Sequence, residues 1–177
     1  MPQLQLSALG ALVVSAALFD LRFRRIPNWL NAAGWLLGIG LQIAAHGATG
    51  AKQDLLGSGL ALAVYTGLFA LRAMGAGDVK LMAAVGAFTG PVHWLYVFLL
   101  ASVIGGVIAL VAVLSKGALL RVARTIAFLV WDLVHFRAPF HAHPELDVGN
   151  EKARTLPHGV AIALGTLLYE VLFANAK

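Results

Sequence analysis

Two aspartates stand next to long apolar stretches of this sequence, and their positions make them the first candidates for chemistry. Asp78 follows Gly75-Ala76-Gly77 and precedes an apolar stretch, whereas Asp20 ends the first apolar stretch of the chain. A carboxylate beside hydrocarbon is costly, so it usually has a role. Two carboxyls that share one proton supply a base that activates water and an acid that protonates a leaving group. Such a pair is suited to hydrolysis of a peptide bond if the fold brings Asp20 and Asp78 together.

The residues around Asp78 allow a structural interpretation as well as a functional one. Asp is a favoured N-cap, so Asp78 can simply cap the next helix. Gly75 and Gly77 are expected to let the turn adopt positive φ and to let a substrate backbone come close. Lys80 is expected to pair with a carboxylate or a lipid phosphate, or to extend its ammonium group to the membrane surface. The helix dipole favours Asp78, at a helix N-terminus, as the anion and Asp20, at a helix C-terminus, as the acid.

Composition places the chain in a membrane. Of the 177 residues, 60% are hydrophobic and 12% are charged, against about 25% charged in soluble domains. We expect one all-helical, polytopic membrane domain over residues 1–177. The chain has no cysteine, which excludes disulfides, thiolate zinc sites and cysteine nucleophiles. Its net charge of +5 comes from residues between the apolar stretches, which indicates membrane orientation and no nucleic-acid partner.

Hydropathy and turn residues predict a bundle of about six helical segments. These segments cover about residues 4–20, 29–45, 54–71, 78–88, 91–114 and 157–174. Asn28 is expected to cap the second segment, residues 46–53 to form a polar loop, and Thr89-Gly90-Pro91 to break an apolar stretch that is too long for one crossing. Residues 117–136 have an amphipathic pattern, and the sequence leaves open whether they lie on the membrane or cross it.

The basic residues predict the orientation of these segments. If the N-terminus lies outside, Lys52 and Lys177 are outside and the other 11 of the 13 basic residues are on the cytoplasmic side. This distribution satisfies the positive-inside rule. The same topology puts Asp20, at the end of the first segment, and Asp78, at the start of the fourth, on one cytoplasmic face.

Three stretches of the sequence together resemble a known family. They are DLRFRRIPN at 20–28, GAGDVKL at 75–81 and LPHGVAIALG at 156–165. In this combination and order they resemble the type IV prepilin peptidases, which are membrane aspartyl proteases of the GxGD class. The resemblance implies that Asp20 and Asp78 are the catalytic pair and that no metal or organic cofactor is needed. It also implies a multi-pass protein of the bacterial inner membrane, surrounded by lipid. Its substrates are prepilins or pseudopilins, recognised by leader and N-terminal helix and cut at the cytoplasmic face.

Three features of the sequence indicate which members of the family it resembles. The chain has no cysteine-containing segment between its first two helices, so it is similar to the short peptidases of tight-adherence (Flp) pilus systems, and methyl transfer is not expected. His158 stands where the family usually has an aromatic residue. Phe19 precedes the first aspartate, where presenilin-like proteases have tyrosine. Two alternatives stay open: an archaeal-type preflagellin peptidase, and a small transporter that uses Asp20 and Asp78 as a proton or cation site.

Overall fold

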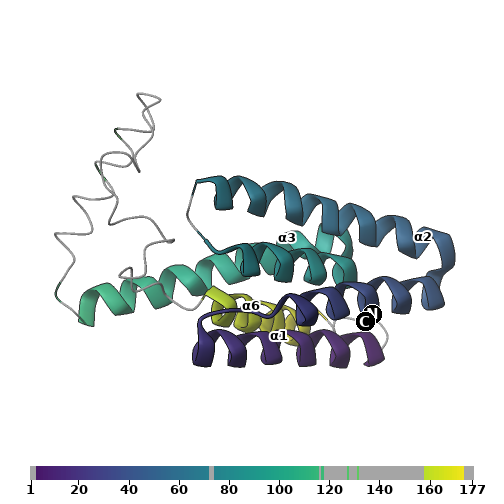
Figure 1. Cartoon of the computed structure of the whole chain (residues 1–177), viewed down its shortest axis with the longest axis horizontal. Coiled ribbons are helices and arrows are strands. Elements are labelled where there is room, and N and C mark those ends of the chain that lie inside the picture. Colours follow the sequence, from purple (N-terminus) through teal and green to yellow (C-terminus); the bar gives the residue numbers. More distant parts are fainter. Residues whose placement is uncertain are drawn as a thin grey trace.

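The computed structural model describes residues 3–71, 74–115 and 158–173, together with residues 117, 127 and 131. The described residues form four helices and no strand (Figure 1), which agrees with the all-helical class predicted from the sequence. The helices are α1 (Gln3–Phe23), α2 (Asn28–Ala70), α3 (Ala76–Ser115) and α6 (His158–Phe173). The predicted amphipathic segment at 117–136 falls outside the described residues, apart from the three single positions.

The prediction of about six helical segments is wrong in its count, because two of the predicted breaks do not end a helix. The expected loop at 46–53 is helical, and the helical backbone of α2 is interrupted there at Gly47, with φ 61° and ψ −145°. The break expected at Thr89-Gly90-Pro91 is a kink within α3, where Gly90 has φ 69° and ψ 176°. Glycine adopts positive φ without steric cost, and the chain folds back at both points (Figure 1).

The connection between α1 and α2 differs from the expected one at a single residue. The N-cap of α2 is Pro27, which makes no side-chain capping bond, and Asn28 is the first residue of the helix. The prediction that Asn28 caps this helix is therefore wrong. Pro27 has extended backbone angles of φ −62° and ψ 137°, and its ring favours such a φ immediately before a helix. The Asn28 side chain is consequently free to reach another element.

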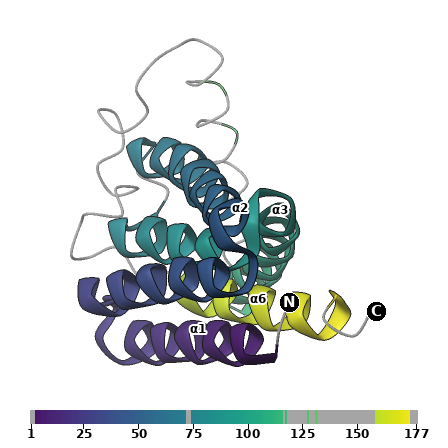
Figure 2. The ribbon, with the colours of Figure 1, turned by 90° about the vertical axis from the view of Figure 1, so that its right-hand side faces the viewer.

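α3 is the central element of the bundle. It packs against both α2 and α6, and α1 packs mainly against α6. The end-on view in Figure 2 shows α1 and α6 next to each other, with α2 and α3 beyond them. Every residue from 81 to 90 is buried. Glycines permit the closest approach between α2 and α3, because a Cβ on Gly57 would collide with the carbonyl oxygen of Gly86.

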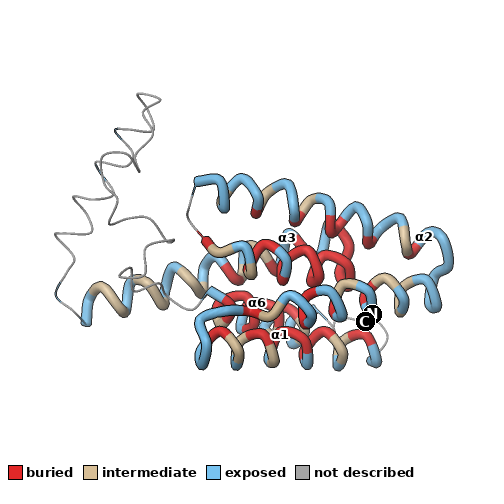
Figure 3. The backbone as a smooth tube through the Cα atoms, viewed as in Figure 1, coloured by how far each residue is buried: buried red, intermediate tan, exposed pale blue. Residues whose placement is uncertain are grey.

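The outer surface of the bundle is apolar. Large side chains such as Leu36 and Val103 are 64% and 65% exposed, respectively, and Figure 3 shows the exposed residues on the outward faces of the helices. Two helices, Gln3–Phe23 and Ala76–Ser115, are long and apolar enough to cross a membrane. These features are consistent with a helical membrane protein whose outer faces contact lipid. The number of crossings and the orientation stay predictions.

Candidate active site

Asp20 lies inside the bundle, one turn before the end of α1. Its side chain is 8% exposed, and its Oδ2 accepts a hydrogen bond of 2.8 Å from the backbone N–H of Gly159. A Cβ at position 159 would lie 2.9 Å from the same oxygen, so the backbone of α6 approaches the carboxyl as closely as glycine allows. The N-terminus of a helix carries partial positive charge. The first turn of α6 therefore stabilises a negative charge on Asp20.

Asp78 occupies the first turn of α3 and is 9% exposed. Its Oδ2 accepts a hydrogen bond of 3.2 Å from the backbone N–H of Gly75. The carbonyl of Gly75 in turn accepts the N–H of Asp78 at 3.1 Å and that of Val79 at 3.4 Å. The bond to Asp78 is one half of a capping box, in which an acidic side chain in the first turn accepts the N–H of the residue before the helix. Gly75 has no side chain, so its backbone carbonyl takes the place of the other acceptor. Asp78 thus helps to begin its helix and keeps its carboxyl at the helix N-terminus.

The two carboxyls act on each other. The negative charge of Asp20 acts on Asp78 through space, and His158 acts electrostatically on both. Arg24, immediately after α1, is a further cation that acts on Asp20. Three helices, α1, α3 and α6, therefore bring ionisable groups to one place in the bundle. The two aspartates singled out from the sequence are neighbours in this cluster.

Asn31 connects the start of α2 to the glycine-rich turn before Asp78. It is 3% exposed, and its Nδ2 donates a hydrogen bond of 3.2 Å to the carbonyl of Gly77. The Gly77 position also faces Ile26, whose Cβ would lie 3.4 Å from a Cβ added there. The stretch that follows Asp20 is in this way packed onto the stretch that contains Asp78.

Lys80 makes a second connection between the same stretches. Its Nζ donates a hydrogen bond of 2.9 Å to Oδ1 of Asn28. The sequence predicts pairing with a carboxylate or a lipid phosphate, but in the described part of the chain the hydrogen-bond partner of Lys80 is Asn28, not Asp20 or Asp78. A cavity of about 390 Å³ lies beside this contact. Its lining residues are Asn28, Asn31, Ala32, Trp35, Leu62, Lys80 and Ala83.

The glycines of the turn act through their small size. Neither Gly75 nor Gly77 has positive φ, so the expectation that they provide a left-handed turn is wrong. Gly77 belongs to α3 and allows close contact with Ile26, while Gly75 supplies the N–H that binds Asp78. Close packing and backbone donation are the roles that their geometry supports.

The arrangement around Asp20 also corrects the expected assignment of acid and base. The sequence places Asp20 at a helix C-terminus, yet its carboxyl contacts the N-terminus of α6. Both carboxyls thus lie at helix N-termini, and the dipole argument no longer distinguishes the anion from the acid. Gly159 was not recognised from the sequence as a site residue, because its partner is 139 positions away. The LPHGVAIALG stretch was the available signal.

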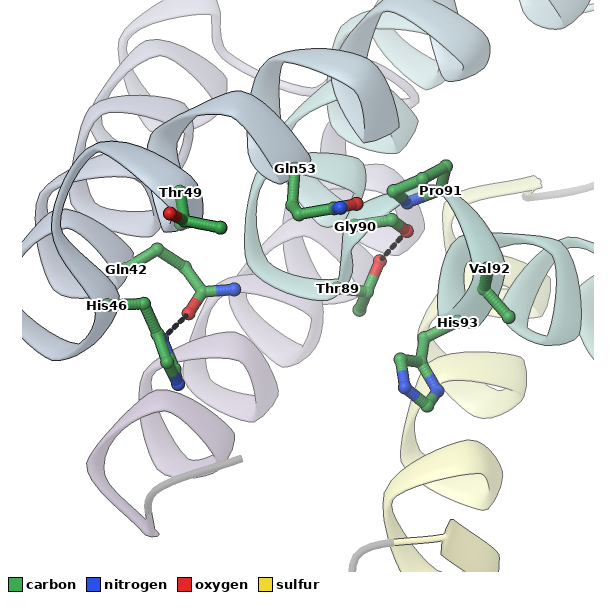
Figure 4. Close-up of a pocket in the computed structure, with 10 residues that line it drawn as sticks. Gln42, His46, Thr49, Gln53, Thr89, Gly90, Pro91, Val92 and His93 are labelled. Atoms are coloured by element: carbon green, nitrogen blue, oxygen red, sulfur yellow. Dashed lines mark hydrogen bonds between the residues drawn. The ribbon is translucent and has the colours of Figure 1, made fainter.

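A separate cavity of about 460 Å³ lies at the kinks of α2 and α3 (Figure 4). Gln42, His46 and Gln53 line it from α2, and Thr89 and His93 from α3. Figure 4 shows the hydrogen bond between His46 Nδ1 and Gln42 Oε1, which spans 2.9 Å. The kink at Gly90 is 12 residues from Asp78 along α3, or roughly 18 Å at the helical rise. This cavity is therefore distinct from the aspartate cluster.

Comparison with known proteins supplies one match. A model described as the type IV leader peptidase family matches residues 7–110, a range that includes both Asp20 and Asp78 and ends before α6. No curated protein and no solved structure matches the chain. The match confirms the family-level resemblance inferred from the stretches around the two aspartates.

Proposed function

Because the chain belongs to the type IV leader peptidase family, we propose that it is an aspartyl endopeptidase that removes the leader of type IV prepilins or pseudopilins. Membership in this family implies a peptidase. The observation that supports the two-aspartate chemistry is the meeting of Asp20 and Asp78, which come from α1 and α3, are at most 9% exposed and act on each other.

The proposed reaction uses one proton shared between the two carboxyls. The ionised aspartate takes a proton from water while the water oxygen bonds to the carbonyl carbon of the scissile peptide, and the protonated aspartate donates its proton to the carbonyl oxygen. The tetrahedral intermediate then collapses. The aspartate that took the water proton gives it to the nitrogen, the other aspartate takes a proton from one hydroxyl of the intermediate, and the C–N bond breaks. A carboxylic acid and an amine leave, and the pair again carries one proton. No atom other than those of water is added to the substrate.

Backbone donors hold the two carboxyls in position for this reaction. Gly159 donates to Asp20, and Gly75 donates to Asp78. In each case one carboxylate oxygen is fixed by a helix N-terminus, which supports the single negative charge that the pair must carry. Since both residues have the same kind of support, either can serve as the base.

Features of the sequence support the proposed location and substrate. The positive-inside rule supports an active site at the cytoplasmic face of the bacterial inner membrane, where the basic leader of a prepilin and its apolar N-terminal helix meet. The absence of a cysteine-containing insertion between α1 and α2 favours the prepilins of tight-adherence (Flp) systems. Membership in a peptidase family favours hydrolysis over a proton or cation transporter. The alternative of a preflagellin peptidase is tested by replacing the prepilin with a preflagellin in the leader-removal assay described next.

The test is leader removal in cells that co-express an Flp-type prepilin with the protein. Wild type is expected to convert the precursor, and Asp20→Asn and Asp78→Asn are each expected to leave it uncleaved, because the amide keeps the shape but cannot act as base or shared acid. Asp54→Asn is the matched control, since Asp54 is a buried aspartate of α2 with 0% exposure. Immunoblots of the membrane fraction check that all variants accumulate. Normal processing by both Asp20→Asn and Asp78→Asn contradicts the proposal.

A further inference from the structure

The cavity of about 390 Å³ beside the glycine-rich turn has walls from distant parts of the sequence. Leu62 lines it from the part of α2 beyond the kink, and Lys80 and Ala83 line it from α3. The remaining wall is one face of the first part of α2, whose residues are three or four positions apart: Asn28, Asn31, Ala32 and Trp35. The volume lies within the range of ligand sites, roughly 300–1,000 Å³.

Hydrogen bonds within the protein hold the walls of this cavity in place. Nε1 of Trp35 donates a hydrogen bond of 3.0 Å to Oγ of Ser58, and this hydroxyl donates one of 3.0 Å to the carbonyl of Ala83. Ser58 is 4% exposed, so the two bonds fix the indole of α2 against α3. A side chain that is fixed before a ligand arrives loses little conformational freedom on binding. The cavity is therefore preorganised.

The cavity and the turn before Asp78 share a side chain. Asn31, which lines the cavity, donates its Nδ2 hydrogen bond of 3.2 Å to the carbonyl of Gly77, the residue directly before Asp78. Lys80 follows Asp78 by two positions on α3. An extended peptide advances about 3.3 Å per residue. A substrate whose scissile bond lies at the aspartates consequently has residues near the cut within reach of the cavity.

The chemistry of the walls favours an apolar segment of a peptide. Trp35, Leu62 and Ala83 supply apolar surface. Lys80 supplies a positive charge, which repels a basic segment. Oδ1 of Asn31 is buried and has no hydrogen-bond partner in the described part of the chain. Because an unpaired buried acceptor is costly, a backbone N–H of a bound peptide would stabilise this wall.

We propose that this cavity is a substrate subsite that holds apolar residues of the prepilin directly after the scissile bond, and that Lys80 keeps the basic leader out of it. The inference rests on the proposed function and adds the part of the substrate that is bound. Trp35 and Leu62 contact the apolar side chains, and Asn31 pairs with the backbone. The leader and the mature segment thereby take different places, which sets the direction of the peptide across the aspartates.

The first experiment fills the cavity from its exposed edge. Ala32 and Ala33 are exposed neighbours in α2, and of the two Ala32 lines the cavity. Ala32→Trp is expected to raise the KM for a prepilin by at least about tenfold with little change in kcat, a size typical of an altered contact in a hydrophobic pocket. Ala33→Trp is the matched control and is expected to behave as wild type. Thermal midpoints in detergent check that both variants fold. Equal KM values for the two variants overturn the inference.

A charge exchange between protein and substrate tests the role of Lys80. Prepilin variants carry Glu or Lys at each of the first few residues after the cut, one position at a time. At the position nearest Lys80, wild type is expected to cleave the Glu form with a kcat/KM about fivefold higher than the Lys form, the upper range for an exposed ion pair. Lys80→Glu is expected to reverse this preference, which loss of the contact with Asn28 alone does not do. Reversal at a leader position, or at no position, overturns the inference.

Cross-linking tests the same placement without cleavage. The Asp78→Asn protein carries the photoreactive residue p-benzoylphenylalanine either at Leu62, which lines the cavity, or at Leu56, which is 51% exposed in the same part of α2. Mass spectrometry maps the cross-links on a full-length prepilin. The probe at position 62 is expected to capture residues directly after the cut, and the probe at position 56 is not. Capture of the leader alone, or of lipid alone, by position 62 overturns the inference.

These experiments separate the subsite from the proposed function. If wild type removes no leader, the proposed function fails, and the cross-links to the uncleaved prepilin still decide which segment the cavity holds. If wild type removes the leader, but position 62 captures no mature segment and Ala32→Trp matches Ala33→Trp, the subsite is refuted and the peptidase activity stands.

Discussion

The backbone N–H of Gly159 donates a hydrogen bond of 2.8 Å to Oδ2 of Asp20, and this contact joins α6 to α1 across 139 positions of sequence. The contact makes the last described helix part of the site, although the family match ends at residue 110. It gives Asp20 the same support that Gly75 gives Asp78. Each of the two carboxyls therefore accepts a hydrogen bond from a backbone N–H at a helix N-terminus.

Substitution of Gly159 by alanine tests this contact. The added Cβ would lie 2.9 Å from Asp20 Oδ2 and 3.2 Å from Asp20 Cγ, so the carboxyl or the helix must move. Misplacement of a reacting group by about 1 Å can cost about 100-fold in rate. We expect kcat on a prepilin to fall by at least about tenfold with a smaller change in KM. Gly106→Ala is the control, because nothing lies within 4 Å of a Cβ there. Equal activity of Gly159→Ala and wild type would contradict a site that depends on this approach.

Asn31→Ala tests the connection between α2 and the turn before Asp78. Asn31 is buried, and loss of its amide removes the hydrogen bond to Gly77 O. The half-buried carbonyl of Gly77 then loses its side-chain donor, which costs about 0.5–1.5 kcal/mol. We expect a lower thermal midpoint in detergent together with a reduced kcat. Asn28→Ala is the comparison, since Asn28 is exposed and loss of its contact with Lys80 is compensated by water. A larger loss of stability in Asn28→Ala than in Asn31→Ala would show that this ranking of the two contacts is wrong.

The sequence predicts the order and direction of the segments, but it does not predict which residues of different helices come into contact. The alternation of the segments and the distribution of the basic residues predict that Asp20 and Asp78 lie on one face of the membrane. The contacts of Gly159 with Asp20 and of Lys80 with Asn28 depend on side-by-side packing of helices, which hydropathy does not encode. Prediction from the sequence also fails locally at Gly47. The polar, glycine-containing stretch 46–53 predicts a loop, but in the structure a single residue with positive φ makes the turn within α2.

Gly57 and Gly59 offer a sharp test of the packing between α2 and α3. A Cβ on Gly57 would lie 2.8 Å from the Cα of Gly90 and would also collide with Gly86, whereas nothing lies within 4 Å of a Cβ on Gly59. We expect Gly57→Ala to destabilise the protein by about 1–3 kcal/mol, the cost of overpacking. Gly59→Ala is expected to be neutral or to stabilise by up to about 1 kcal/mol, because alanine favours the helix. The measurement is the thermal midpoint of both variants in the same detergent. Similar midpoints for the two variants would refute the close contact.

The pH dependence of wild-type cleavage tests whether the two aspartates work as a pair. At low pH both carboxyls are protonated and no base is available, whereas at high pH both are ionised and no acid is available. The rate should therefore rise and then fall with increasing pH, and the two limbs belong to the pair jointly. The measurement is kcat/KM from about pH 4 to pH 9, with Asp54→Asn as a control that keeps both limbs because Asp54 lies in α2, outside the pair. A profile with only one ionisation, near the ordinary value of about 4 for an isolated aspartate, would mean that one carboxyl acts alone. The shared-proton chemistry would then have to be abandoned even if Asp20→Asn and Asp78→Asn are both inactive.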